Sequence, residues 1–301
     1  MKNGLVVKDN ALINASYNLE VTEQRLILLS IINARETGQG ITADSKLEIH
    51  ASDYAKQFNV SLDAAYKALK EAVNNLFERQ FSFQEETKKG IGIVRSRWVS
   101  RIKYIDTSAI LEITFAPDVV PLITRLEQHF TTYQIQQVTK LTGKYVIRLY
   151  EILIAWRDIG KVPLIELSDF RKKIGVEDNE YIAMNNFKNR VLEPAIKQIN
   201  EHTDITVKYE QHKTGRTITG FSFSFKQKKE HQKPEPKQKI ISDKQLDLFA
   251  NKLAHDDAFS SQFSEVGESY ENFAERIKIQ LKDAAYLDKF SAYLDKLGLK
   301  M

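Results

Sequence analysis

The chain has 301 residues, 42% of them hydrophobic and 28% charged, and it contains no cysteine. This composition is typical of a soluble globular protein and gives room for two domains and a tail. The lack of cysteine excludes a disulfide scaffold and a thiolate metal site, and it fits the reducing cytoplasm, where we expect the protein. No apolar run resembles a signal peptide or a membrane span.

The formal net charge of +4 hides an asymmetry along the chain. The segment from Ile240 to the end has 11 acidic and 8 basic residues, a net charge of −3. The first 239 residues have 36 basic and 29 acidic residues, a net charge of +7. A basic body indicates a polyanionic partner, although ordinary surface charge is an alternative explanation.

Residues 1–130 show the pattern of a winged-helix domain. We expect an extended arm over residues 5–17 and a helix over about residues 22–35. A helix-turn-helix follows, in which Tyr54 and Phe58 lie four apart on one helix face behind an N-cap at Ser52-Asp53. The apolar face of its second helix consists of Leu69, Ala72, Val73 and Leu76.

Strands complete this first layout. The first strand begins at Phe81 and a turn at Gly90-Ile-Gly92 follows it. The second strand covers residues 93–105, and the third covers residues 111–115, alternates with period two and ends before Pro117. Three helices followed by a β-hairpin are typical of a winged helix.

Residues 131–226 repeat this order. We expect a helix over about residues 133–156 and then a helix-turn-helix from Leu164 to Gln198. Ser168-Asp169 is its expected N-cap, and Gly175 is placed to end its first helix. Its second helix contains Pro194, and there we expect a bend between an exposed start and a packed end. A second hairpin follows, with strands over residues 205–209 and 217–225 and a turn at residues 213–216.

The two copies match each other along the chain. Ser52-Asp53-Tyr54 corresponds to Ser168-Asp169-Phe170 at an offset of 116 (169 − 53), and the flanking helices match at an offset of 123. Arg25-Leu26 then corresponds to Arg148-Leu149. Because matches occur before, inside and after the motif, we predict a duplicated domain and an α+β fold with two tandem winged helices.

The composition changes abruptly after the second hairpin. Residues 226–239 contain no large apolar side chain, and we expect a disordered linker over residues 227–243. The pattern of residues 244–301 is helical, with Phe273, Ile277 and Leu281 at four-residue spacing, but its apolar surface is too small for an independent domain.

Amide and basic side chains gather where winged helices touch DNA, because arginine pairs with guanine, asparagine with adenine, and basic side chains with phosphates. In the second copy the candidates are Asn185, Asn186, Lys188, Asn189, Arg190, Lys197, Lys208, Lys213 and Arg216. In the first copy they are Ser61, Tyr66, Lys67, Lys70, Lys88, Lys89, Arg95, Arg97, Arg101 and Lys103. A solvated helix face is the alternative interpretation of both sets.

Patterns of catalysis are missing from the sequence. Thr142-Gly-Lys144 lacks the upstream glycine of a phosphate-binding loop. The six histidines have no metal-ligand spacing, and none of the twelve tyrosines accompanies such a site. We therefore expect no catalytic residue, no metal and no cofactor.

Several segments resemble plasmid replication initiator proteins of the iteron-binding class. They are Val7 to Tyr17, Thr22 to Leu26, Lys144 to Glu151 and Phe187 to Asn200. The resemblance covers roughly residues 5–226 and implies tandem winged helices that bind directly repeated origin sequences in duplex DNA. It also implies melting of adjacent DNA, recruitment of the host initiator and helicase, and a monomer that initiates in equilibrium with a homodimer that represses. In this family the first domain often serves dimerisation as well.

A pentapeptide near the predicted linker resembles a further motif. Gln245, Leu246, Asp247, Leu248 and Phe249 look like the peptide by which bacterial proteins bind the replication sliding clamp. In that interpretation Leu248 and Phe249 are apolar anchors on a tethered peptide. The alternative is that Leu246, Phe249 and Leu253 begin an amphipathic helix.

The sequence thus predicts a non-enzymatic plasmid replication initiator that binds repeated double-stranded DNA. A winged-helix transcriptional repressor without a replication role is the main alternative. A nicking enzyme is the more distant one.

Overall fold

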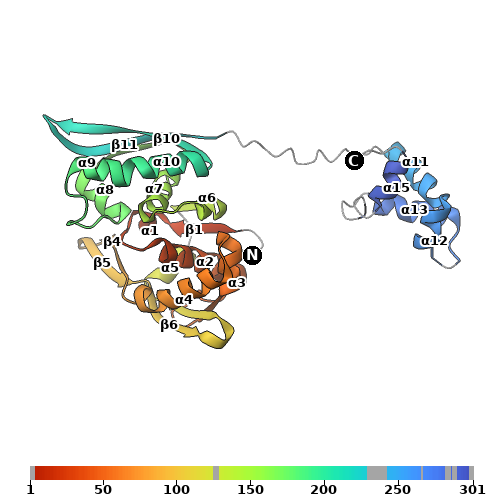
Figure 1. Cartoon of the computed structure of the whole chain (residues 1–301), viewed down its shortest axis with the longest axis horizontal. Helices are drawn as coiled ribbons and strands as arrows, with labels where there is room; N and C mark the ends of the chain where they lie inside the picture. Colours follow the sequence, from red (N-terminus) through yellow and green to blue (C-terminus); the bar gives the residue numbers. More distant parts are fainter. Residues whose placement is uncertain are drawn as a thin grey trace. The chain divides into compact units, whose positions relative to one another are not determined.

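The computed structural model describes residues 4–124, 129–228, 243–265, 267–281, 286 and 290–297. The chain divides into two compact units, Met1–Lys228, here called the body, and Lys229–Met301, here called the tail (Figure 1). The predicted linker over residues 227–243 falls largely outside the described residues.

The first winged helix has a three-stranded sheet in the order β3-β7-β6. Its elements in chain order are α2 (Val21–Thr37), β3 (Leu47–His50), α3 (Ala51–Phe58), α4 (Leu62–Leu76), β6 (Val99–Ile105), the 3₁₀ turn η1 (Asp106–Ser108) and β7 (Ile110–Phe115). The predicted helices are confirmed here. Buried Tyr54 and Phe58 of α3 pack against each other with ring centroids 4.9 Å apart, as their spacing predicts.

An additional hairpin lies between α4 and β6, and here the strand prediction was wrong. The expected strand over residues 93–105 is two strands, β5 (Gly90–Arg97) and β6, which belong to different sheets. They separate at Trp98, which is fully buried. β5 pairs with β4 (Gln80–Thr87), and β4 pairs with β2 (Ser16–Tyr17). The true wing of the first copy is therefore β6–β7.

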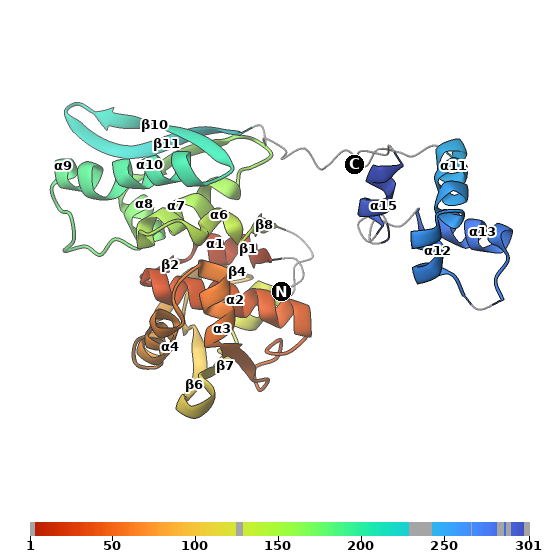
Figure 2. The same cartoon turned by 45° about the vertical axis from the view of Figure 1, so that its right-hand side comes forward.

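The second winged helix repeats the first without the additional hairpin. Its elements are α7 (Lys144–Ile154), β9 (Lys161–Glu166), α8 (Leu167–Ile174), α9 (Met184–Phe187), the π-helical turn η2 (Lys188–Leu192), α10 (Glu193–His202), β10 (Ile205–Thr214) and β11 (Thr217–Gln227). The sheet order is β10-β11-β9. α3 and α8 begin 116 residues apart, and α2 and α7 begin 123 apart, so the duplication is confirmed. Figure 2 shows α9 and α10 in line beside the β10–β11 hairpin.

The two helix-turn-helix motifs begin earlier than predicted. His50 is the N-cap of α3 and Glu166 that of α8, so Ser52-Asp53 and Ser168-Asp169 lie inside the first helical turn. In both copies the strand before the helix runs into it without a loop, which moves the helix start forward. The predicted end of α8 is confirmed, because Gly175 takes the left-handed conformation of a C-cap.

The N-terminal arm joins the two copies. It consists of β1 (Leu5–Asp9), α1 (Asn10–Asn14) and β2. We predicted an extended arm, but its middle is helical. β1 pairs with β8 (Phe130–Gln134). The expected helix over residues 133–156 was wrong in its first part, where β8 is followed by α6 (Gln136–Thr139) before α7 begins after Gly143. α5 (Val119–Thr124) precedes β8. The β1–β8 pair crosses residue 130, where we expected the domain boundary.

The tail has its own apolar core, contrary to expectation. Its described helices are α11 (Asp243–Ala254), α12 (Asp257–Phe263), α13 (Tyr270–Gln280) and α15 (Ser291–Lys296). Phe259 is fully buried among aromatic rings, including those of Phe273 and Phe290. The sequence analysis underestimated the apolar area that the tail can bury, because aromatic side chains bury more area per residue than aliphatic ones. No described helix is long and apolar enough to cross a membrane.

Candidate nucleic-acid interface

The second recognition helix is continuous from α9 through η2 to α10. Phe187, Val191, Ala195 and Ile199 form a buried stripe spaced by four residues, and Leu192 is buried beside it. Phe187 lies over an aromatic core, with its ring centroid 6.1 Å from those of both Phe170 and Phe221. The opposite side of the helix therefore faces solvent along its whole length.

One arginine holds the turn that precedes this helix. The Arg171 guanidinium donates hydrogen bonds to the carbonyl oxygens of Glu177, Glu180 and Tyr181. It also lies over the Phe187 ring, 5.2 Å from the centroid. Because a planar guanidinium makes several directed bonds at once, it fixes where the chain enters the recognition helix. Sequence reasoning missed this role of Arg171.

The predicted DNA-contact residues of this helix lie on its solvent side. Asn185, Asn186, Asn189, Arg190 and Lys197 are exposed, and Lys188 is partly so. The Asn189 amide donates to the Asn185 Oδ1 over 3.1 Å, and Lys188 Nζ donates to Gln211 Oε1 over 3.3 Å. Lys197 lies farther along the helix, 4.0 Å from Glu201. The helix start therefore presents amide and guanidinium donors of the kind that read base edges.

The second hairpin carries exposed cations. β10 and β11 pair from Ile205 with Gln227 to Thr214 with Thr217. Lys208, Lys213 and Arg216 are exposed on it, and Arg216 stands at its tip beside Gly215, whose φ is +61°. Among the described residues, neither Arg190 nor Arg216 has an ion-pair partner. Both guanidinium groups are therefore available to an anion.

Cations of the first recognition helix are partly engaged within the protein. Lys67 lies 3.9 Å from Glu71 and Lys70 lies 3.7 Å from Asp106, while Tyr66 is exposed. The Ser61 hydroxyl accepts a hydrogen bond from the Ala64 amide and so caps α4. Helix capping therefore accounts for a serine at position 61 without a DNA contact.

The basic run in the first copy is divided between two sheets. Lys88 and Lys89 are exposed at the turn of the additional hairpin, and Arg95 is exposed on β5. Arg97 donates to the Phe77 carbonyl oxygen over 2.6 Å and pairs with Glu78. The expectation that these residues share one wing with Arg101 and Lys103 was wrong, because the latter lie on β6. There the hydrogen bond from Arg101 lowers the pKa of Glu112.

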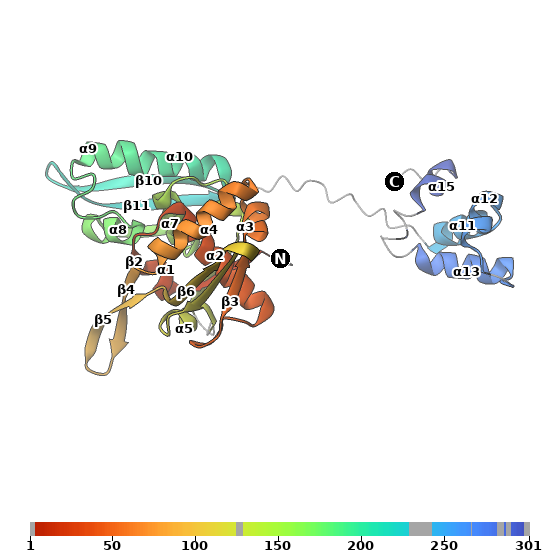
Figure 3. The same cartoon turned by 60° about the horizontal axis from the view of Figure 1, so that its bottom comes forward.

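The tips of the two hairpins lie on the same side of the body as α9. Figures 1 and 3 both show the ends of β4–β5 and β10–β11 projecting to the left of the body, where α9 also lies. Elements of both copies therefore lie on one side of the body.

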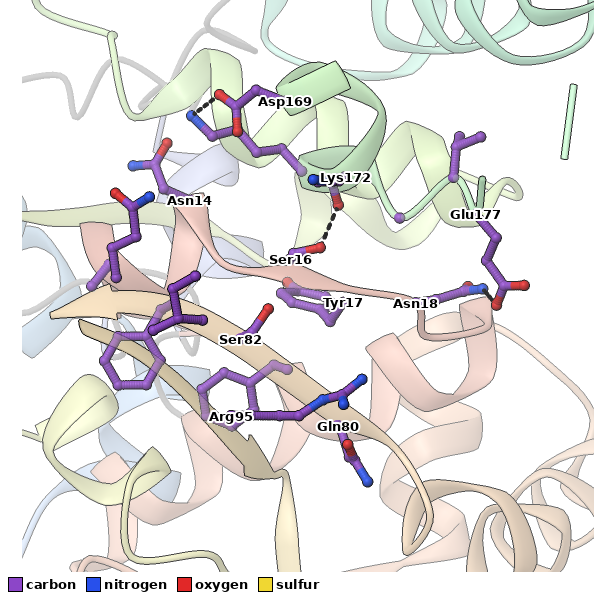
Figure 4. A pocket seen from close by; sticks show the side chains of 18 of the residues that line it. Asn14, Ser16, Tyr17, Asn18, Gln80, Ser82, Arg95, Asp169, Lys172 and Glu177 are labelled. Carbon is purple, nitrogen blue, oxygen red and sulfur yellow. Dashed lines mark hydrogen bonds and ion pairs between the residues drawn. The ribbon is translucent and has the colours of Figure 1, made fainter. Parts of the chain in front are cut away.

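A polar groove of about 860 Å³ separates α8 from β2, β4 and β5 (Figure 4). Ser16 Oγ donates to the Lys172 carbonyl oxygen over 3.1 Å, and the Asn18 amide donates to Glu177 over 2.9 Å. At one end Gly175 touches β2, since a Cβ on it would lie 2.5 Å from the Tyr17 carbonyl oxygen. The groove therefore marks the junction between the two copies.

A buried charge network, which we did not predict from the sequence, lies at this junction. Lys8 Nζ lies 2.6 Å from Glu151 Oε1, and Arg148 lies 2.7 Å from Glu151 Oε2. The Tyr133 hydroxyl also donates to Glu151, and Arg148 donates to Tyr17 over 2.6 Å. All five of these side chains are at least 95% buried.

Arg148, on α7, extends this network to the backbone of two other segments. Its guanidinium donates to the carbonyl oxygens of Ile13 and Ala15 in the arm and of Lys173 in α8. Burial alone would raise the pKa of Glu151, but the charges of Lys8 and Arg148 lower it to about 2. The network therefore binds the arm, α7 and α8 together through one ionised carboxylate. The described residues contain no group of three acidic or histidine side chains arranged to hold a metal ion.

Comparison with known proteins identifies the family. The family model for the Initiator Replication protein, WH1, matches residues 5–154, and that for the Initiator Rep protein, WH2, matches residues 166–225. An uncharacterized 27.6 kDa protein of Escherichia coli is 26% identical over 71% of this chain and 92% of its own length. A replication initiation protein of Escherichia coli is 26% identical over 67% of this chain, and the match spans 63% of that protein, just under two thirds.

Two solved structures are similar to parts of this chain. The Pi initiator protein in complex with iteron DNA has a TM-score of 0.60 and 20% identity, covering 76% of this chain and 99% of that one. The WH1 domain of a replication protein isolated from a multiple sclerosis patient is 62% identical, with a TM-score of 0.35, over 42% of this chain and 97% of that one. Because the two family models together match well over half of its residues, the chain belongs to the initiator replication proteins with tandem winged-helix domains, WH1 and WH2.

Proposed function

We propose that this chain is a plasmid replication initiator that binds repeated sequences of origin DNA. The observation that carries the proposal is the start of the WH2 recognition helix, where exposed amides and Arg190 accompany a hairpin with exposed cations. The fold relative crystallised with iteron DNA supports duplex DNA as the ligand. In this proposal Asn185, Asn186, Asn189 and Arg190 read bases, whereas Lys188, Lys197, Lys208, Lys213 and Arg216 contact phosphates.

The proposed role of the WH1 domain is sequence-independent contact with DNA phosphates. Its proposed phosphate contacts are Tyr66, Lys67, Lys70, Lys88, Lys89 and Arg95. All six are exposed, and none lies among several amides at the start of a recognition helix. We assign no DNA contact to Ser61 and Arg97, whose polar groups are engaged within the protein. Contacts of this kind give sequence-independent affinity that falls as the salt concentration rises.

We also propose that WH1 supports a homodimer in equilibrium with the monomer. β5 is the last strand of its sheet, and on it Ile91 and Ile93 are 68% and 78% exposed. An unpaired strand edge with exposed apolar side chains favours pairing with another strand. The monomer is the proposed initiator and the dimer the proposed repressor.

The proposed role is that of a binder and not of an enzyme. Opening of the origin then draws on binding energy, and the host initiator and helicase are the proposed partners at the opened DNA.

The sliding clamp is a further proposed partner through Gln245–Phe249. These residues lie in α11 and not in a free peptide, and Phe249 is buried in the tail core. Clamp binding through Phe249 thus requires that α11 releases it.

Replication in cells tests the proposal. A plasmid that carries this gene with its flanking DNA, and no other origin, is introduced into host cells as wild type or as Arg190→Ala. We expect colonies only with the wild type and with the control Arg35→Ala, an exposed arginine at the end of α2. Failure of the wild type to replicate, together with repression of its own promoter, would identify a repressor instead.

A further inference from the structure

The π-helical turn in the WH2 recognition helix has a local cause. Within η2 the Glu193 amide donates to the Lys188 carbonyl oxygen, five residues back. The next residue, Pro194, has no amide hydrogen to give to Arg190, which lies four residues back. Its ring also clashes with that carbonyl in a regular α-helix. A wider turn just before Pro194 relieves the clash.

The buried stripe of the same helix is narrower with this wider turn. Phe187, Val191, Ala195 and Ile199 are all at least 98% buried and recur every four residues. A regular α-helix has 3.6 residues per turn, so three such steps would rotate Phe187 away from Ile199 by about 120°. A π turn holds more residues per turn and reduces that drift. It therefore lets Phe187 and Ile199 pack on the same side.

The exposed donors rotate with the buried stripe, because they belong to the same helix. Asn185, Asn186 and Asn189 lie before or within the π turn, as does Arg190. Ala195 and Ile199, which anchor the later part of the helix in the core, lie after it. The π turn thus sets the angle between the donors and the rest of the domain.

We propose that Pro194, through the π turn, is a positioning residue that sets which base edges the recognition helix can reach. This inference rests on the proposed DNA-binding function and adds a determinant of its specificity. Pro194 itself need not touch a base. A proline that shapes a helix in this way constrains sequence preference and leaves the phosphate contacts of the β10–β11 hairpin unchanged.

Selection from random duplexes tests this with Pro194→Ala and Pro194→Gln, each of which restores the amide hydrogen. The matched control is Pro163→Ala, at an exposed position of edge strand β9. Affinities for the wild-type site and for random DNA are measured in the same salt. Melting temperatures and a crystal structure of Pro194→Ala show whether the π turn persists.

We expect both variants at Pro194 to lose discrimination for the wild-type site by at least about tenfold, equivalent to roughly one bidentate side chain–base pair. Their affinity for random DNA and their melting temperatures should not fall, and Pro163→Ala should behave like the wild type. Unchanged discrimination, or a π turn that persists without the proline, overturns the inference but leaves the proposed function intact. A parallel loss of stability and of all DNA affinity also overturns it, because the role is then merely structural. Failure of the wild type to enrich any sequence would reject the proposed function itself.

Discussion

At the scale of single residues, substitution of Arg190 tests base reading most directly. Its guanidinium has no ion-pair partner among the described residues and lies at the start of the recognition helix. We expect Arg190→Ala to cost about 1–3 kcal/mol on the cognate site and to relax specificity at one position. Competition binding with single-base variants of the site measures this. An equal loss on random DNA would contradict the base-reading role.

Arg216 makes the complementary prediction. It stands at the tip of the β10–β11 hairpin, where a phosphate contact carries no sequence information. We expect Arg216→Ala to weaken binding to all DNA alike and to flatten the logarithmic salt dependence by roughly one unit. Affinity measured at several salt concentrations tests this, and an unchanged slope would place Arg216 away from the DNA backbone.

Gly175 tests the contact between the two copies. Its φ is +82° and its missing side chain makes room for the Tyr17 carbonyl oxygen, whereas Gly215 has φ +61° and open space around it. We expect Gly215→Ala to cost about 1–2 kcal/mol, the cost of the left-handed conformation alone. Gly175→Ala should cost more than about 3 kcal/mol, because two backbone segments would also have to separate. Chemical denaturation measures both, and equal costs would contradict the close contact.

At the scale of elements, the sequence predicted those helices and strands that depend on residues close together in the chain. The helix-turn-helix cores follow from pairs such as Phe170 and Ile174, four residues apart on one helix face. The β1–β8 pairing could not be predicted, because Val6 and Tyr133 meet across more than a hundred residues. Residues 133–141 therefore read as the start of a helix. Local periodicity does not show that a strand partner lies elsewhere in the chain.

The division of β5 from β6 could not be predicted for a similar reason. Residues 93–105 have one continuous apolar and polar pattern, but Trp98 is buried and its backbone forms hydrogen bonds to residues outside the β4–β5 and β6–β7 hairpins. Its amide donates to the Arg79 carbonyl oxygen, and its own carbonyl oxygen accepts from the Ala116 amide. Most of the candidate DNA-contact residues are exposed in the structure. The partners that engage Ser61, Arg97 and Arg101 could be found only from the structure.

Helix α11 offers a prediction about the clamp-like peptide. Phe249 is 8% exposed and packs in the tail core, whereas Leu248 is 51% exposed on the same helix. We expect Phe249→Ala to destabilise the tail by about 3–5 kcal/mol and Leu248→Ala to change it by less than about 0.5 kcal/mol. Amide hydrogen exchange of α11 and α13 in the full chain measures this. Clamp binding that survives in the folded Leu248→Ala variant would argue against the clamp motif.

At the scale of the whole body, the buried network links the arm, α7 and α8 through Glu151. Removing its charge leaves Lys8 and Arg148 buried without their carboxylate. We therefore expect Glu151→Gln to cost about 3–5 kcal/mol at neutral pH. The matched control is Glu48→Gln, at an exposed position of β3, which should cost less than about 0.5 kcal/mol.

The same network predicts a dependence of stability on acid. The pKa of Glu151 falls from 4.5 to about 2 on folding, a difference equivalent to about 3 kcal/mol. Because the folded pKa is the lower one, this stabilisation is present above about pH 4.5 and is lost as the pH falls towards 2. Denaturant unfolding between pH 7 and pH 3 should show a shallower acid dependence in Glu151→Gln than in the wild type. Parallel curves would contradict an ionised Glu151.

Selection of binding sites from random duplexes, followed by footprinting of the winning sequence, tests the central claim most directly. We expect one enriched site that is protected in two patches about one helical turn apart, because the hairpin tips of both copies lie on one side of the body. The patch contacted by WH2 should carry the stronger sequence preference. If no sequence is enriched, the chain is not a reader of repeated origin DNA.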